Sequence, residues 1–161
     1  MRFIFKGIAQ GILYLHEEMN FANRDIKPDN LLFVTQKGGT NNQLEDRAQI
    51  ADFTTIVECT SVVNDSHGTP AFSPPEVLNQ QSAAGYLPKP VDIWAMGISI
   101  YCLWFGHLPH KNIEDAKTKP VVIPEDPEMS KELRDALERL LAWDVADRAT
   151  ITQVVQLDWF K

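Results

Sequence analysis

Four polar side chains, three in one short loop and one at the end of a later apolar stretch, have the chemistry needed to move a phosphoryl group. Asp25, Lys27 and Asn30 lie in the loop at 23–30, and Asp52 follows the second stretch. Phosphoryl transfer leaves little covalent chemistry to the protein, so positioning and charge neutralisation do most of the work. The Asp25 carboxylate can take the proton of an attacking hydroxyl, while the Lys27 ammonium faces the phosphate.

The side-chain oxygens of Asn30 and Asp52 are hard donors of the kind that Mg²⁺ accepts, so these two residues are the predicted metal ligands. Other interpretations exist for each part of the pattern. The loop alone would suit a turn of Asn, Asp and Pro with surface charge, and Asp52 alone would suit the turn after a strand. The order of the parts along the chain favours the catalytic interpretation.

A helix is predicted directly before the loop, from about Phe3 to Met19. Apolar residues recur there at steps of three and four, which places on one face Ile4, Ile8, Ile12, Leu15 and Met19. After the loop, the apolar stretches 31–35 and 48–51 predict an antiparallel strand pair whose tip is the Gly- and Asn-rich patch at 38–42. Two strands alone do not form a stable sheet, so this ribbon must lean on helices.

Periodicity disappears between Asp52 and Glu76, and connections of this length are usually functional or disordered. A helix that is apolar on almost every side is then predicted from Asp92 to near Gly106, and such a helix belongs in the centre of a fold.

Two further helices follow the central one. Ser130 is placed to cap an amphipathic helix that carries Leu133, Leu137, Leu140 and Leu141. Thr150 and Gln153 have the spacing of a capping box at the start of a final short helix. The predicted fold class is mainly α with a small β-ribbon, in one compact domain.

Size and charge narrow the possible functions. The chain has 161 residues and a formal net charge of −7, which argues against a surface for duplex nucleic acid, because such binding needs clustered Lys and Arg. Cys59 and Cys102 lie far apart and have no metal-binding or redox spacing. The longest apolar run, 93–105, is shorter than a bilayer requires. We therefore expect a soluble, cytoplasmic protein without nucleic-acid or membrane partners.

These motifs resemble the larger, helical lobe of a eukaryotic-type protein serine/threonine kinase. The similarity covers essentially the whole chain, so residues 1–161 are expected to form a partial kinase domain, from the helix before the catalytic loop to the last helix. By this resemblance Arg24, Asp25 and Asn30 belong to the catalytic loop and Asp52 to the metal-binding motif, while residues 74–76 end the activation segment. The implied cofactors are ATP and Mg²⁺.

The resemblance also assigns supporting roles. Thr69 matches the threonine that contacts Asp25 and Lys27, and Leu32 matches a position beneath the adenine ring. Further residues match structural positions. Asp92 matches the buried aspartate that braces the catalytic-loop backbone, and Glu76 and Arg148 match a buried ion pair.

Within the kinases, three stretches look most similar to calcium/calmodulin-dependent protein kinase kinases: residues 14–16, residues 68–72, and residues 91–97 followed by Tyr101 and Cys102. This similarity implies a protein substrate, such as another kinase, and calmodulin-linked regulation outside this chain.

Several features depart from the family pattern. There is no room before Phe3 for the small lobe, so the chain alone is expected to bind ATP poorly and to be inactive. Asn23 stands where histidine is usual in the family, so a ring that packs beneath the metal-binding motif is expected to be missing, and Thr54 stands where glycine is usual. A second hypothesis is therefore a pseudokinase or interaction module without turnover. A third is a small-molecule phosphotransferase, although the long segment ending at Glu76 favours a protein substrate.

Hydroxyl residues in the long irregular segment lie where kinases are often phosphorylated, namely Thr60, Ser61 and Ser66. Arg24 is the residue that would receive such a phosphate. The alternative is that these three are ordinary loop hydroxyls.

Overall fold

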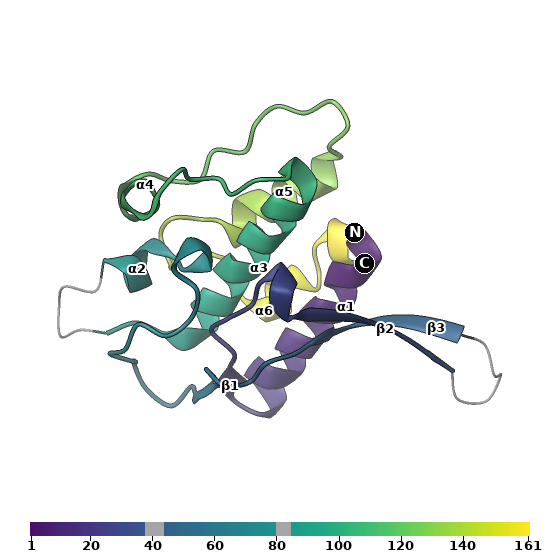
Figure 1. Ribbon diagram of the computed structural model, residues 1–161, viewed down its shortest axis with the longest axis horizontal. Coiled ribbons are helices and arrows are strands. Elements are labelled where there is room, and N and C mark those ends of the chain that lie inside the picture. Colours follow the sequence, from purple (N-terminus) through teal and green to yellow (C-terminus); the bar gives the residue numbers. More distant parts are fainter. Residues whose placement is uncertain (38–43, 80–84) are drawn as a thin grey trace.

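The computed structural model describes residues 1–37, 44–79 and 85–161. Most of the regular structure is helical, and Figure 1 shows the helices gathered into one body from which a two-stranded ribbon projects. The predicted hairpin tip at 38–42 lies outside the described residues.

The helices and strands alternate irregularly along the chain. In order, the α-helices and β-strands are α1 (Arg2–Leu13), β1 (Phe21–Ala22), β2 (Leu31–Lys37), β3 (Leu44–Ile50), β4 (Val57–Glu58), α2 (Pro75–Leu78), α3 (Pro88–Phe105), α4 (Ile113–Thr118), α5 (Lys131–Leu140) and α6 (Ile151–Val154). Shorter turns of helix are a π-helix at Tyr14–Glu18 and 3₁₀ turns at Pro28–Asn30, Pro70–Phe72 and Asp158–Phe160.

Helix α3 occupies the centre of the body, as its almost uniformly apolar sequence predicts. Figure 1 shows α1 and α5 on different sides of it, and its buried side chains include Trp94, Met96 and Ile100. The helix begins four residues before the predicted start, with Pro88 at its first position, where the missing N–H costs nothing. It ends at Gly106, whose φ of 76° suits a residue without a Cβ.

Helix α1 buries the predicted face only in part. Ile8 and Ile12 are fully buried, but Met19 is 47% exposed. The predicted helix from about Phe3 to Met19 is present, but α1 gives way to a π-helix at Tyr14–Glu18 for its last turn. A π-helical turn holds more residues than an α-helical turn and therefore rotates the side chains that follow it, Met19 among them. His16 lies four residues after Ile12 and continues the buried face into the interior.

The predicted ribbon is present and longer than expected, with β2 and β3 antiparallel and Leu31 opposite Ile50. It lies against α1, where Gly7 leaves so little space that an added Cβ would meet the Ala48 carbonyl oxygen at 3.3 Å.

A second strand pair was not predicted. Strands β1 and β4 pair antiparallel, with Phe21 opposite Glu58, which ties the polar loop to the start of the long irregular segment.

The predicted helix caps are confirmed. The Ser130 hydroxyl accepts a hydrogen bond from the Leu133 amide at 3.2 Å, and Thr150 with Gln153 forms the reciprocal capping box. None of the helices in the described ranges is both long and apolar enough to cross a membrane.

Close packing around α3 predicts that one of its residues tolerates no side chain. A Cβ on Gly97 would lie 2.7 Å from Leu141 Cδ2 and 3.0 Å from Leu140 Cβ. We expect Gly97→Ala to lower the free energy of unfolding in urea by about 1–3 kcal/mol, because the core must move apart. Gly11→Ala is the matched control, since its Cβ would meet Ile50 Cδ1 at an ordinary 3.4 Å. Equal stability of the two variants would contradict the packing.

Candidate active site

The polar loop runs from β1 into the 3₁₀ turn at Pro28–Asn30 and then directly into β2. Pro28 begins the turn with its φ already fixed by the ring, and the backbone N–H of Asn30 donates to the Lys27 carbonyl at 2.9 Å. Both ends of the loop are therefore held by strands, and the side chains between them are presented from a fixed backbone.

Three of the predicted residues surround the Asp25 carboxylate. Lys27 Nζ donates to Asp25 Oδ2 at 2.8 Å, and Asn30 Nδ2 donates to the same oxygen at 2.9 Å. The Thr69 hydroxyl donates to the other oxygen at 2.6 Å and accepts from Lys27 Nζ at 2.6 Å. Residues that are 44 positions apart thus form one cluster, as the sequence analysis expects.

These contacts decide the charge of Asp25. Burial by itself would raise the pKa of the carboxyl, but hydrogen bonds from Lys27 and Thr69 outweigh it, and the pKa lies below the ordinary 3.8. A folded-state pKa that is lowered stabilises the fold above the ordinary value, and this stability is lost as the pH falls through the lowered pKa. At neutral pH the group is a carboxylate, the form that a proton acceptor requires.

Asp52 lies just past β3 and is exposed, with a φ of 60°. Its Oδ1 accepts from the Thr54 hydroxyl at 2.6 Å and from the Thr54 amide at 3.0 Å. These two bonds lower the pKa of Asp52, and the bond from the hydroxyl has the larger effect.

The donor set suits Mg²⁺ in type. Asp52 contributes a carboxylate, and Asn30 contributes an amide oxygen, because its nitrogen is the atom that donates to Asp25. No cluster of three or more His, Cys, Asp or Glu side chains suited to a metal occurs within the described ranges. Magnesium needs no such cage, since it is usually held by one or two carboxylates together with substrate phosphates.

Asn23 has a structural role that was not predicted from the sequence. Its side chain is fully buried, donates to the Asp52 carbonyl at 2.8 Å and accepts from the Asp25 amide at 3.0 Å. The loss of a packed histidine ring was the expected consequence of Asn23. The amide instead makes one hydrogen bond to the backbone of Asp52 and one to the backbone of Asp25, which its paired donor and acceptor make possible.

Asp92 lies beneath the loop on α3 and is fully buried. Its Oδ1 accepts from the Arg24 amide at 2.6 Å, and its Oδ2 accepts from the Asn23 amide at 2.8 Å. His16 Nε2, from the π-helix, lies 2.9 Å from the same Oδ2. The structure therefore places Asp92 against the loop backbone, where the resemblance puts a brace.

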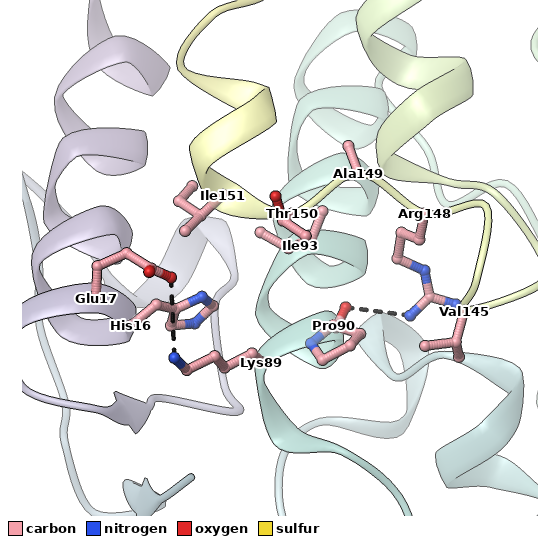
Figure 2. A pocket seen from close by; sticks show the side chains of 10 residues that line it. All are labelled: His16, Glu17, Lys89, Pro90, Ile93, Val145, Arg148, Ala149, Thr150 and Ile151. Atoms are coloured by element: carbon pink, nitrogen blue, oxygen red, sulfur yellow. Dashed lines mark hydrogen bonds and ion pairs between the residues drawn. The ribbon is translucent and has the colours of Figure 1, made fainter.

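The predicted ion pair between Glu76 and Arg148 is also formed. Two nitrogens of Arg148 meet the two oxygens of Glu76 at 2.6 and 3.1 Å, and the guanidinium lies 4.9 Å from the centre of the Trp94 ring. Figure 2 shows a pocket lined in part by Arg148. On one side of it Arg148 donates to the Pro90 carbonyl, and on the other side Glu17 and Lys89 form an ion pair. Arg148 is the buried partner, whereas 20% of the Glu76 side chain is exposed, so the predicted burial of the pair holds fully only for Arg148. Removing Glu76 would leave the buried charge of Arg148 without its anion.

The side chain of Arg24 is buried and already has an anionic partner. Its Nη1 donates to Asp65 Oδ1 at 2.6 Å and to the Tyr86 hydroxyl at 3.2 Å. Asp65 and Tyr86 were not identified from the sequence, since nothing in an irregular segment marks which residue will turn inward.

The remaining predicted residue, Leu32, lies on β2 with 52% of its surface exposed. The hydroxyl residues Thr60, Ser61 and Ser66 are exposed as well.

The Asp92 contacts lead to a stability prediction. Asp92→Asn replaces one acceptor oxygen with an N–H donor, so a buried donor loses its partner at a cost of about 1–3 kcal/mol. Urea unfolding of the variant should show this loss, whereas Asp135→Asn, on the exposed face of α5, should stay within about 0.5 kcal/mol of the parent. Unchanged stability of Asp92→Asn would show that the carboxylate is not a brace.

The chain is similar in sequence to known serine/threonine-protein kinases. The chain is 34% identical to the serine/threonine-protein kinase par-4 of Caenorhabditis briggsae, over 98% of this chain and 24% of that protein. It is 31% identical to a serine/threonine-protein kinase stk11 homolog of Dictyostelium discoideum, over 98% of this chain and 26% of that protein. It is 35% identical to the calcium/calmodulin-dependent protein kinase kinase cmkC of Emericella nidulans, over 96% of this chain and 29% of that protein.

The chain thus spans about a quarter of the length of these curated relatives. Their similar identities place calcium/calmodulin-dependent protein kinase kinases among the relatives without setting that group apart. The family model of the protein kinase domain matches residues 1–160, and the chain belongs to the protein kinase family.

Proposed function

We propose that this chain is the large lobe of an ATP- and Mg²⁺-dependent protein serine/threonine kinase. The observation that carries the proposal is the cluster in which Lys27, Asn30 and Thr69 all hydrogen-bond to the Asp25 carboxylate. A surface turn has no need of a carboxylate ordered by residues from two distant segments, whereas a proton acceptor must be held in one orientation.

Each residue of the site has a proposed role. Asp25 accepts the proton of the substrate Ser or Thr hydroxyl. The hydroxyl oxygen forms a bond to the γ-phosphorus of ATP, the bond between that phosphorus and the bridging β-phosphate oxygen breaks, and ADP leaves. Lys27 neutralises charge on the transferred group, and Thr69 orients both Asp25 and Lys27. Asn30 and Asp52 would hold Mg²⁺, which when bound supplies further neutralisation of the phosphates.

The surface near the site supports the large-lobe assignment. Leu32, Phe33 and Phe53 are 52%, 56% and 46% exposed, although they lie on or beside the elements that carry the loop and Asp52. Leu32 and Phe33 are successive residues of β2 and therefore point to opposite faces of the ribbon, so the three side chains do not form one patch. We propose that a small lobe covers Leu32 and Phe53, that Leu32 then lies beneath the adenine, and that the isolated chain has little turnover because its nucleotide site is open.

We propose a protein substrate, such as another kinase, and calmodulin-linked regulation that resides outside this chain, by similarity to the calcium/calmodulin-dependent protein kinase kinase relative. The proposed location is the cytoplasm, without nucleic-acid or membrane partners.

One observation favours the second candidate, a pseudokinase or interaction module. The Thr54 hydroxyl occupies Asp52 Oδ1 at 2.6 Å, an oxygen that a metal would otherwise use. The intact set of Asp25, Lys27, Asn30 and Asp52 weighs against it, because a lobe kept only for binding has no use for all four.

The test joins the chain to the small lobe of one of the kinase relatives, ahead of Met1. We expect Mg²⁺-dependent phosphorylation of Ser or Thr in a protein substrate, and a fall of about 10²–10⁴-fold in kcat for Asp25→Asn, the usual contribution of a general base. Asp135→Asn is the control and should keep full turnover.

Undiminished turnover in Asp25→Asn would refute the role of Asp25. Binding of ATP and Mg²⁺ without turnover in the joined protein would favour the pseudokinase, and strong turnover by the isolated chain would refute the need for a small lobe.

A further inference from the structure

The buried guanidinium of Arg24 lies outside the Asp25 cluster and makes three hydrogen bonds. Arg24 is 6% exposed, and its Nε donates to the Thr55 carbonyl at 2.8 Å while its Nη1 donates to Asp65 and Tyr86. A charge buried this far requires a counter-anion, since an unpaired one is costly in a low-dielectric interior. Asp65 provides it, with Nη1 and Oδ1 only 2.6 Å apart.

Tyr86 completes a three-membered network. Its hydroxyl donates to Asp65 Oδ1 at 3.1 Å and accepts from Arg24 at 3.2 Å, so both groups lie on one side of the guanidinium. His67 approaches the other carboxylate oxygen, with Nδ1 at 3.0 Å from Asp65 Oδ2. The carboxylate therefore has polar partners at both oxygens.

The backbone around Asp65 is fixed on both sides, so this contact is not a chance surface pair. Val63 and Tyr86 exchange two backbone hydrogen bonds of 2.9 Å, which dock the segment two residues before Asp65. That bridge requires Gly85, whose φ is 68° and whose Cβ would lie 2.7 Å from the Val63 carbonyl oxygen. Three residues after Asp65, Gly68 lies against the Arg24 carbonyl oxygen with a φ of 102°, too close for any Cβ.

The hydroxyl residues of the same segment, Thr60, Ser61 and Ser66, are exposed. The Asp65 side chain is 35% exposed and bonds to the arginine. A phosphate on one of the hydroxyl residues would carry about 1.5–2 negative charges. It would have to compete with a carboxylate that already balances the charge of Arg24, and on Ser66 it would stand beside that carboxylate.

We infer that Asp65 is a positioning residue that occupies the Arg24 pocket in place of a phosphorylated side chain, so that the segment from 54 to 68 is ordered without phosphorylation. The effect of Asp65 on turnover rests on the proposed kinase function, whereas its effect on the order of residues 54–68 does not. Through Arg24, the pair links this segment to the backbone that presents Asp25.

The first test measures order in the isolated chain, treated with phosphatase and shown to be unphosphorylated by mass spectrometry. Hydrogen exchange across residues 54–68 should become about 10- to 100-fold faster in Asp65→Ala, which corresponds to loss of a hydrogen bond to a charged group. Asp65→Asn keeps the shape without the charge and should resemble Asp65→Ala, whereas Asp65→Glu should recover much of the protection. Exchange in Asp65→Ala equal to that of the parent would overturn the inference.

The second test measures turnover of the chain joined to a small lobe, again without phosphate on the segment. The parent and the triple variant Thr60→Ala, Ser61→Ala, Ser66→Ala should have the same kcat, while Asp65→Ala should lose about tenfold or more and Asp65→Glu should regain it. Loss of turnover in the triple variant, or on phosphatase treatment of the parent, would overturn the inference. If the parent has no turnover at all, the proposed function fails, and the exchange measurement still decides the role of Asp65.

Discussion

The carboxylate of Asp92 is the contact on which the rest of the site depends. It is fully buried on α3, the helix around which the core is built, and it accepts the amides of Asn23 and Arg24. A buried carboxylate that receives backbone N–H groups is stable only when those donors stay in place, because each lost partner leaves an unsatisfied group. The stability of the core is thereby coupled to the geometry of a loop that would otherwise be free to rearrange.

The same contact explains the strained backbone next to Asp25. Arg24 has a φ of 69°, a conformation that costs a residue with a Cβ about 1–2 kcal/mol. The bond of its amide to Asp92 and the approach of Gly68 to its carbonyl oxygen hold it there. Arg24 thus points its side chain toward Asp65 while the next residue, Asp25, faces Lys27 and Thr69. One braced peptide segment orients two networks at once.

Local signals were enough to predict much of this molecule. The caps at Ser130 and Thr150 depend on neighbouring residues, and the apolar run in α3 could only be buried. The Asp25 cluster was expected because the types and order of its residues matched a family pattern.

The features that were missed depend on contacts between distant residues. The π-helix at Tyr14–Glu18 is inserted in an ordinary apolar repeat, and Asn23 was expected only to remove a ring. No neighbouring residue in the sequence distinguishes Asp65 from other polar residues of the segment. It is directed to Arg24 by the β-bridge between Val63 and Tyr86, which are more than twenty residues apart. Sequence periodicity does not report which polar group of an irregular segment will pair with a buried charge.

The most direct measurement of the brace is hydrogen exchange at the amides of Asn23 and Arg24 in the isolated chain, followed by NMR. Because both donate to the Asp92 carboxylate, they should be as protected as core amides of α3 such as that of Ile98, and should exchange only on global unfolding. Exchange at the rate of unprotected loop amides would show that the candidate active site is not held by the core, and would contradict the preassembled arrangement of Asp25 and its partners.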